Sequence, residues 1–362
     1  MSSPPSAKYV LIQTTMGDYR QAFVKAIIEH FNESLTILCG QTYFYESLKT
    51  GVVGSRVFVT ARNIFFLKRR VLLQLGVQRT AIQAESAVLE YNPRIINTWT
   101  VAFIRRILGR RTILWGHVYS RRGNDNWLRY FQRSLATGLI VYTEQQKEIL
   151  INELKYRGEA FAAPNALYTH AEMQPLDGPE RTGFLYVGRL VADKKPMQML
   201  NAFVMAMPQL PADSKLLIVG DGPERANLER RILELNLSDR VKMFGHVGDY
   251  ARLKEIYRQA LASISAGAVG LSITQSLGFG VPMLYSRHDP HGPEIVAARE
   301  GWNCLCFETD SVQDLSAHML QLQNERAAWI SRAAAISSEC RASFSVEKMA
   351  GEFIKAVLGP DK

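Results

Sequence analysis

The chain has 362 residues, of which 47% are hydrophobic and 21% charged, a composition that is typical of globular proteins and excludes a disordered or fibrous chain. One hydrophobic core rarely fills a chain of this length, so two domains are expected. The formal net charge of +9 is uneven, because residues 1–165 contain 22 basic and 11 acidic residues, whereas the remainder contains 21 basic and 23 acidic ones.

The first half of the chain alternates short apolar runs with amphipathic ones. Lys8–Thr14 is predicted to be a buried strand before a turn at Met16–Asp18, and apolar residues at three- and four-residue steps over 23–31 predict a helix. Further strands are predicted at 35–38, 94–98, 112–115 and 139–142. Thr143 is placed to cap the helix after the last of them. This alternation indicates parallel βαβ units.

The excess positive charge of this half collects in four clusters, with apolar and aromatic residues between them: Lys68–Arg70, Arg105–Arg106, Arg110–Arg111 and Arg121–Arg122. Such a mixture suits anionic membrane headgroups or a diphosphate-bearing acceptor. A solvated helical face is the alternative. Nucleic acid is disfavoured, because the sequence has no zinc-finger spacing, no RNP-like aromatic segment and no long basic tract.

The chain shows no sign of export or membrane insertion. The most apolar stretch, residues 64–77, is interrupted by Lys68–Arg70 and is shorter than the roughly 18 residues that a spanning helix needs. Met1–Pro5 lacks a basic segment and a long apolar core, so no signal peptide is predicted. We expect a cytoplasmic protein, which would bind peripherally to the inner face of the membrane if the basic clusters bind lipid. Cys39, Cys304, Cys306 and Cys340 are expected to be reduced, packed thiols.

Hydrophobic periodicity stops over Ala163–Asn165 and 169–182, which we take as a linker. The second half resumes with predicted strands at 183–187, 215–220, 241–244, 262–265, 282–286 and 304–307. A helix from about Pro223 and a last helix at 346–358 are also predicted. The expected fold class is α/β, with two parallel-sheet domains facing across a cleft and ligands bound outside the carboxyl ends of the strands.

The segment Tyr186–Lys195 joins a strand to a glycine turn and then supplies two cations five positions apart. Gly188 allows the backbone to approach phosphate oxygens, Arg189 offers a planar fork of donors, and Lys194 adds a compact charge. This combination suits a diphosphate. The alternative is an ordinary strand-to-helix turn with solvated cations.

Gly220–Arg225 also follows a strand and opens a helix, so its backbone amides could face a ligand. The third glycine of the dinucleotide-binding motif is replaced by Arg225. A nicotinamide enzyme is therefore disfavoured.

Five motifs in order resemble the donor half of retaining glycosyltransferases of family 4, which have the GT-B fold. They are Val187–Leu190 with Lys194, Ile218–Glu224, Phe244–Val247, Gly270–Pro282 and Gly292–Val296. The resemblance is close in the second half and thin in the first. It implies an acceptor-side Rossmann-like domain at residues 1–168, with a C-terminal helix at about 346–362 packing back on it. Residues 169–345 would then bind the nucleotide sugar.

The resemblance implies transfer of a sugar from a nucleotide-diphosphate sugar with retention at the anomeric carbon, without a metal or other cofactor. Arg189 and Lys194 match the pair that neutralises the leaving diphosphate. His117 matches a histidine that contacts the donor sugar, although a histidine paired in the core is the alternative. The acceptor is expected to be a lipid-linked glycan or a polysaccharide or oligosaccharide intermediate.

The resemblance also assigns donor binding to Gly17, Gly188, Gly220, Gly245, His246, Val247, Gly270, Leu271, Ser272, Gln275 and Glu294. Gly17 could equally form a plain tight turn. Glu294 could bind sugar hydroxyls or cap a short helix at 295–299. The loop His288–His291 is expected to be a polar loop rather than a metal site.

The sequence departs from the family at two positions. Where relatives carry two glutamates eight positions apart, this chain has Gly267 and Gln275. Gln275 can form neutral hydrogen bonds but not the charge-assisted pair to a ribose diol. A catalytically silent nucleotide-binding or scaffolding subunit is therefore the alternative function. A nucleotide-sugar epimerase would need carboxylate pairs that the sequence does not place.

Overall fold

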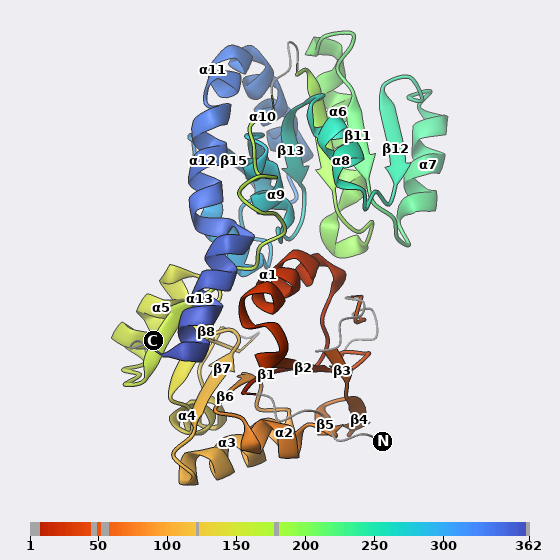
Figure 1. Cartoon of the computed structure of the whole chain (residues 1–362). Helices are drawn as coiled ribbons and strands as arrows, with labels where there is room; N and C mark the ends of the chain where they lie inside the picture. The colour runs from red at the N-terminus through yellow and green to blue at the C-terminus, as the bar shows by residue number, and fades with distance from the viewer. Residues whose placement is uncertain (1–7, 45–48, 52–57, 121–122, 177–180, 360–362) are drawn as a thin grey trace. The chain divides into compact units, whose positions relative to one another are not determined.

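The computed structural model describes residues 8–44, 49–51, 58–120, 123–176 and 181–359. The chain divides into two compact units, labelled by element in Figure 1. Unit 1 comprises Met1–Leu167 and Val346–Lys362, and unit 2 comprises Tyr168–Ser345. The sequence placed the boundary one residue later, between residues 168 and 169. Each unit is built around one parallel sheet, so the expected α/β class with two parallel-sheet domains is confirmed.

The sheet of unit 1 has the strand order β3-β2-β1-β6-β7-β8-β9, and every neighbouring pair is parallel. Its strands are β1 (Tyr9–Gln13), β2 (Leu35–Cys39), β3 (Phe58–Thr60), β6 (Ser86–Glu90), β7 (Arg111–Trp115), β8 (Gly138–Val141) and β9 (Glu159–Ala162). Chain order reverses between β1 and β6, the switch point where ligands of such sheets bind. A separate antiparallel hairpin is formed by β4 (Arg62–Phe66) and β5 (Val71–Leu75).

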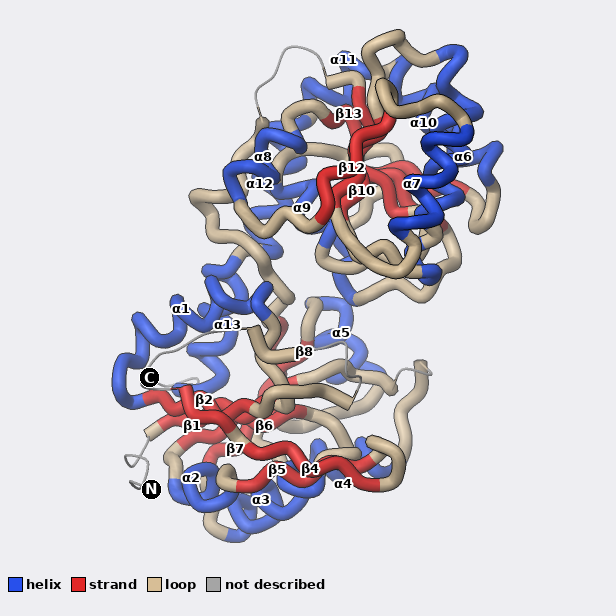
Figure 2. Tube along the Cα trace, turned by 90° about the vertical axis from the view of Figure 1, so that its right-hand side faces the viewer, coloured by secondary structure: helices blue, strands red, loops and turns tan. Residues whose placement is uncertain are grey.

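Helices cover both faces of this sheet, as Figures 1 and 2 show. On one face lie α1 (Gln21–Phe31) and α13 (Val346–Leu358), which share one apolar cluster. On the other lie α2 (Gln78–Gln83), α3 (Ile96–Ile107) and α4 (Trp127–Ser134). The helix α5 (Glu144–Glu148) and a π-helix (Ile149–Glu153) follow β8 in the chain. Thr143 caps α5 as predicted, because its side chain accepts from the Gln146 amide at 3.0 Å.

The strand predicted at 94–98 is wrong, because α3 begins at Ile96. The β-branched pair Ile95–Ile96 favours a strand locally. Val101, Ala102 and the preceding Asn97 and Thr98 are buried on one side of a helix, and this long-range packing decides the structure.

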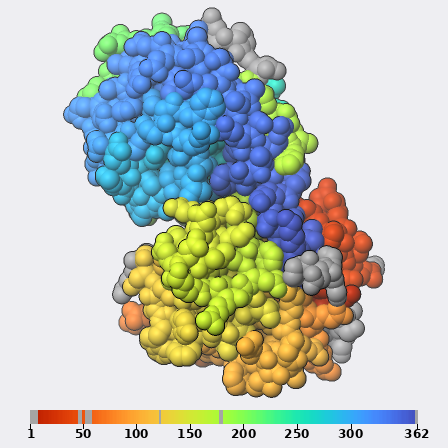
Figure 3. Space-filling model, turned by 90° about the vertical axis from the view of Figure 1, so that its left-hand side faces the viewer, coloured from red at the N-terminus to blue at the C-terminus, as the bar shows by residue number. Residues whose placement is uncertain are grey.

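The last helix ends where the sequence predicted and belongs to unit 1. Phe353 of α13 packs on Phe23 of α1 and on Trp115 of β7, with ring centroids 5.4 and 5.6 Å apart. Lys348 lies 3.7 Å from Glu144, and Figure 3 shows the blue end of the chain against the yellow-green segment that contains β9. Apolar burial and an ion pair thus return the C-terminal helix to the first sheet.

The sheet of unit 2 has the order β12-β11-β10-β13-β14-β15 and is also parallel. Its strands are β10 (Gly183–Val187), β11 (Leu216–Val219), β12 (Val241–Gly245), β13 (Ala260–Ser265), β14 (Met283–Ser286) and β15 (Cys304–Phe307). All six were predicted, because buried parallel strands are continuous apolar runs. The switch point lies between β10 and β13.

Two groups of helices bury the faces of this second sheet. One apolar cluster includes α6 (Pro196–Ala206), α7 (Arg225–Glu234), α10 (Val312–Asn324) and α11 (Arg326–Ser331). Two further clusters include α8 (Tyr250–Tyr257), α9 (Ser272–Gly278) and α12 (Ala333–Phe344). The four cysteines are buried free thiols, as expected. Within the described ranges, no helix combines the length and hydrophobicity needed to cross a bilayer.

Candidate functional site

The predicted donor motifs of unit 2 all follow the carboxyl ends of parallel strands. Residues 188–195 follow β10, 220–225 follow β11, 245–248 follow β12, 267–272 follow β13, and 287–295 follow β14. Parallel strands end on one edge of a sheet, so the fold brings these five loops to the same edge. The two loops that flank the switch point are those after β10 and β13.

Arg189 and Lys194 lie in the loop after β10. Arg189 is exposed, and its guanidinium forms no hydrogen bond or ion pair with the residues that the structure describes. Lys194 ends a short 3-10 helix, Ala192–Lys194, and its half-buried Nζ donates to the Ala268 carbonyl. Burial, and then the charge of Arg189, lower the pKa of Lys194. The two cations are therefore close enough to repel, a strain that a bound anion would relieve.

Carboxylates partly offset this charge. Asp193, Glu294 and Asp289 each act to raise the pKa of Lys194. Glu294 is buried in the 3-10 helix Pro293–Ala297, which forms where the sequence predicted a helix at 295–299. Both roles predicted for Glu294 are compatible with this position, in the first turn and near the cation.

Gly267 packs directly on the loop that carries the cations. A Cβ atom at Gly267 would lie 2.1 Å from the Asp193 carbonyl oxygen and 2.9 Å from the Lys194 Cα. The neighbouring Ala268 amide donates to the same Asp193 carbonyl at 3.3 Å. This close backbone contact has no room for a side chain, so this backbone requires glycine at the position where the resemblance implies a glutamate.

His291 forms hydrogen bonds that connect the loop after β13 to the end of β14. Its Nδ1 accepts from the Val269 amide at 3.0 Å, so the ring proton is on Nε2, which lies 2.8 Å from the Ser286 carbonyl. Burial lowers the pKa of His291. The histidine therefore serves as a neutral bridge between two loops. Over the described ranges, no group of three or more histidine, cysteine or carboxylate side chains could hold a metal ion.

Gln275 is buried in α9, and tyrosine hydroxyls hold both ends of its amide. Its Nε2 donates to the Tyr168 hydroxyl at 2.7 Å, and its Oε1 accepts from the Tyr257 hydroxyl at 3.2 Å. Burial raises the pKa of Tyr168 to about 12, so this hydroxyl stays protonated. A donor contact by Gln275 remains a prediction, and it would require one of these bonds to be shared or exchanged.

The glycines after β11 also serve close packing. A Cβ at Gly220 would lie 1.8 Å from the Gly188 carbonyl oxygen, and one at Gly222 would lie 2.3 Å from that of Leu190. Both have φ values, +145° and +152°, that L side chains rarely adopt. The Gly220 amide, predicted to face a ligand, donates to the Gly245 carbonyl at 2.8 Å.

The remaining predicted donor residues lie at the same edge. Gly245 has φ +67° and turns the chain after β12, so that His246 is exposed while Val247 is buried in the core. Gly270, Leu271 and Ser272 are half-buried where α9 begins, and no atom lies within 4 Å of a Cβ built on Gly270. This open position contrasts with the filled one at Gly267.

The candidates of unit 1 lie at the carboxyl edge of its own sheet. Gly17 follows β1 and precedes the 3-10 helix Asp18–Arg20. His117 follows β7 and is exposed, and its ring lies 4.6 Å from that of Tyr142. Sequence reasoning missed Arg20, which is buried over Trp115 at 4.7 Å.

Sequence reasoning also missed Glu90. This last residue of β6 accepts from the Thr14 amide at 2.8 Å and so ties β6 to the chain after β1, across the switch point. A carboxylate ending an otherwise apolar strand was the available signal.

Several arginines of the basic clusters of unit 1 are engaged inside the unit and are not part of a free cationic surface. Arg105 is fully buried and donates to backbone carbonyls that include Ala84 at 2.8 Å. Arg110 donates to the Ile82 carbonyl at 2.8 Å, and Arg111 pairs with Glu159. Arg69 donates to the Phe44 carbonyl, whereas Lys68, Arg70 and Arg106 are exposed. Arg121–Arg122 lies outside the described residues.

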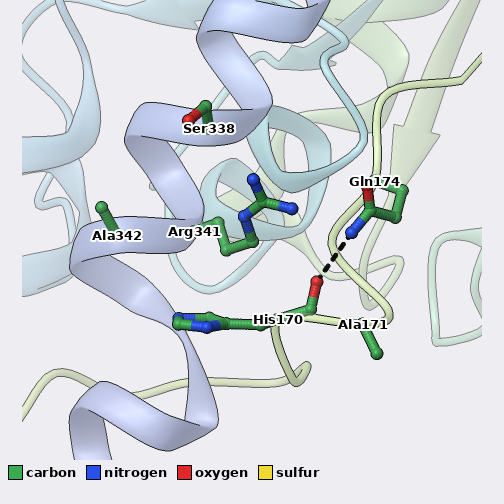
Figure 4. A pocket seen from close by; sticks show the side chains of 6 residues that line it. All are labelled: His170, Ala171, Gln174, Ser338, Arg341 and Ala342. Atoms are coloured by element: carbon green, nitrogen blue, oxygen red, sulfur yellow. Dashed lines mark hydrogen bonds between the residues drawn. The ribbon is translucent and has the colours of Figure 1, made fainter.

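A hollow of ≈ 530 Å³ lies elsewhere in unit 2. It is lined by His170, Ala171, Gln174, Ser338, Arg341 and Ala342, which Figure 4 shows between α12 and the segment before β10. The Gln174 side chain donates to the His170 carbonyl at 3.0 Å across its wall. No predicted site residue lines this hollow, so it is separate from the strand-end loops.

Comparison with known proteins gives a family for most of unit 2. Residues 174–337 match the family model of glycosyl transferases group 1. The chain is 27% identical over 128 residues to N-acetyl-alpha-D-glucosaminyl L-malate synthase of Bacillus anthracis, which is 35% of this chain and 33% of the relative. It is 27% identical over 177 residues to the GtfA subunit of UDP-N-acetylglucosamine–peptide N-acetylglucosaminyltransferase of Streptococcus gordonii, covering 48% and 33%. These matches span about a third of each relative.

Solved structures extend the likeness to the whole chain. Alr3699/HepE of Anabaena, crystallised with UDP, has a TM-score of 0.68 at 14% identity, covering 96% of this chain and 98% of that one. The pneumococcal O-GlcNAc transferase GtfA, in complex with UDP and GlcNAc, has a TM-score of 0.64 at 13% identity, covering 97% and 98%. The chain thus has the fold of GT-B glycosyltransferases, as the resemblance implied, and residues 174–337 match the family model of glycosyl transferases group 1.

Proposed function

We propose that this glycosyltransferase moves a sugar from a nucleotide-diphosphate sugar to a glycan acceptor, with retention at the anomeric carbon. The observation that carries the proposal is the pair Arg189 and Lys194 beside the switch point of unit 2. The exposed guanidinium has no partner among the described residues, and the two charges repel. The complexes of Alr3699/HepE and pneumococcal GtfA with UDP support a uridine nucleotide as the first donor to test.

The chemistry assigned to this pair is electrostatic. As the bond from the anomeric carbon to the diphosphate breaks, negative charge grows on the departing oxygens. Arg189 can hold two of them in a fork, and Lys194, fixed by the Ala268 carbonyl, adds a second charge without moving. Two cations supply the charge that a divalent metal supplies elsewhere, so the proposed reaction uses no metal or other cofactor. His117 is proposed to contact the donor sugar.

The proposed acceptor is a lipid-linked glycan or a polysaccharide intermediate. The curated relatives support sugar transfer in general but name different acceptors, L-malate and a peptide. A role of unit 1 at an anionic membrane cannot rest on Arg105, Arg110 and Arg111, because these three side chains are engaged internally.

The test is thermal melting with a panel of sugar nucleotides, followed by release of nucleotide diphosphate in the presence of glycan acceptors. A donor at 100 times its Kd stabilises the native state by about 2.7 kcal/mol. One donor should raise the melting temperature and the others should not. If no sugar nucleotide or nucleotide diphosphate raises it, the proposal fails.

Gly267 favours one alternative, a silent subunit that binds nucleotide without turnover. The position of the family's first glutamate has no space for a side chain in this backbone. Such a subunit would show the melting shift but no release of nucleotide diphosphate with any acceptor. Retention of the sugar anomer in a product would exclude it.

A further inference from the structure

The helix α4 has an inverted amphipathic arrangement, with its apolar side exposed and its polar side buried. Its apolar residues Trp127, Leu128, Tyr130 and Phe131 are exposed, with Trp127 68% exposed and both Tyr130 and Phe131 54%. Its polar residues Arg129, Gln132 and Arg133 are buried against the unit. A surface helix of a globular domain normally has the reverse arrangement.

The two buried arginines of α4 have partners inside the unit, and these contacts hold the helix in this orientation. The Arg129 guanidinium lies 4.1 Å from the centroid of the Tyr91 ring and donates to the Val118 carbonyl. Arg133 pairs with Asp125 at 2.8 Å. Turning the apolar side inward would break the contacts of Arg129 with Tyr91 and Val118 and the ion pair of Arg133 with Asp125.

Two neighbouring elements extend this apolar surface. On α3, the exposed apolar residues are Ile96, Phe103, Ile104, Ile107 and Leu108. At the tip of the β4-β5 hairpin, Phe66 and Leu67 are exposed. We call these residues, with those of α4, the apolar face of unit 1. Isolated exposed apolar residues are ordinary, but a contiguous group of this size marks an interaction surface.

The segment 91–94 holds the three elements together. The Tyr91 hydroxyl donates to the Arg129 carbonyl of α4 at 2.9 Å. The Arg94 side chain donates to the carbonyls of Arg69 and Arg70 at the hairpin tip, each at 2.7 Å, and α3 begins two residues later. Figures 1 and 2 both show α3 and α4 on the same side of the sheet. The segment 91–94 therefore links the three elements that carry the apolar face.

The charge around this face has one sign. Residues 91–143 contain nine arginines and a single acidic residue, Asp125, which Arg133 neutralises. Arg106 on α3, and Lys68 and Arg70 at the hairpin tip, are exposed. Apart from the paired Asp125, this stretch has no acidic residue to balance the exposed cations, as a protein interface usually would. Anionic lipid headgroups would supply the complementary charge.

We propose that the apolar face of unit 1 docks on an anionic lipid bilayer. Tryptophan and tyrosine favour the bilayer interface, Leu67 and Ile107 can enter the acyl boundary, and the cations meet headgroup phosphates. The inference deepens the proposed function, on which it rests for the acceptor. Arg129 also donates to the His117 carbonyl, so the docking helix directly supports the loop of a predicted catalytic residue. A lipid-borne acceptor would thereby be delivered to unit 1.

The experiment is vesicle flotation of the full chain, with phosphatidylcholine alone and with phosphatidylcholine mixed with phosphatidylglycerol, at low and high salt. Wild type should float with anionic vesicles, less so at high salt. The double variant Trp127→Ser with Phe131→Ser should lose about tenfold in partition per aromatic removed. Leu233→Ser is the matched control, because Leu233 is 67% exposed on α7 of unit 2.

Fluorescence gives a second measurement on the same samples. Trp127 is exposed, so anionic vesicles should shift tryptophan emission of the wild type to shorter wavelength. Trp127→Phe keeps an apolar ring and should still float, while the shift disappears. These two results together place Trp127 in the lipid.

The opposite results overturn the proposal. One is that the double variant floats as well as wild type does, and another is that wild type binds neutral vesicles as well as anionic ones. The third is that wild type binds no vesicles but self-associates in size-exclusion chromatography, and that the double variant abolishes this self-association. The last result would make the face a protein interface. The double variant should keep its melting temperature and its shift with donor nucleotide, so failure of docking and failure of the proposed function are separately visible.

Discussion

The Cα of Gly267 faces the carbonyl oxygen of Asp193 so closely that a Cβ atom would lie only 2.1 Å from that oxygen. This contact joins the loops after β10 and β13 at the switch point of unit 2. It explains physically why the chain carries glycine where the resemblance expects glutamate. It also fixes the backbone around Lys194. The Nζ of Lys194 donates a hydrogen bond to the carbonyl of Ala268, the residue next to Gly267.

Gly267→Ala should therefore lower the free energy of unfolding by about 1–3 kcal/mol and weaken binding of the donor nucleotide, since backbone must move to admit the methyl group. The matched control for the stability effect is Gly270→Ala, because space around Gly270 is open and its φ is not positive. Chemical denaturation and nucleotide melting shifts measure both effects. Equal stability of the two variants would contradict the packing argument.

Arg189→Ala should leave the fold intact and abolish most diphosphate affinity. The guanidinium is exposed and has no described partner, so its loss should change the free energy of unfolding by less than about 0.5 kcal/mol. A lost charge-assisted fork should weaken UDP binding about tenfold or more. Arg230→Ala, also exposed, serves as control. Calorimetric titration with UDP gives the comparison, and unaltered affinity would remove Arg189 from the site.

Gln275→Glu introduces the residue type that the resemblance implies, but it should destabilise this protein. The side chain is buried between two tyrosines, so the pKa of the new carboxyl should rise. A raised folded-state pKa means that stability is retained at low pH and is lost as pH rises above the unfolded value of about 4.3. Unfolding at pH 5 and pH 7 should show the larger loss at pH 7. A stable variant with tighter donor binding would show instead that this side chain faces the ligand.

His291 should make stability depend on pH. Burial lowers its pKa below the ordinary 6.5, so the folded state binds fewer protons than the unfolded state does, and stability falls as pH drops through 6.5. Protonation also breaks the bond from the Val269 amide. His291→Gln should flatten the dependence of melting temperature on pH over this range. The control is His288→Gln, an exposed histidine of the same loop, which should retain the wild-type slope.

Arg105→Lys should be strongly destabilising although it conserves charge. The guanidinium is fully buried and donates to several carbonyls around α2, a set that one ammonium cannot reach. A loss of about 3 kcal/mol or more is expected. Arg106→Lys, on the exposed side of α3, should be close to neutral in the same denaturation experiment. Similar values for the two would mean that Arg105 is not the internal anchor.

The strands of unit 2, the last helix and the cap at Thr143 could all be predicted, since each depends on local patterns. Apolar runs mark buried parallel strands, and 3.6-residue periodicity marks helices. The strand predicted at 94–98 was wrong because its β-branched residues favour a strand locally, whereas packing against the sheet of unit 1 stabilises the helix α3. The motif predicted that Arg189 and Lys194 lie at a strand end. Their contact with the loop after β13 depends on the order of the strands in the sheet.

Sequence alone determined the alternation of strands and helices, the two parallel sheets and the loops at their carboxyl ends, because those features arise from residues near one another in the chain. Tertiary structure decided how polar and small residues are used. It placed Arg105 among carbonyls, Gln275 between tyrosines, Gly267 against Asp193 and the polar side of α4 inward. Each of these depends on a partner brought close by packing of distant segments, and residue type carries no record of which partner that will be.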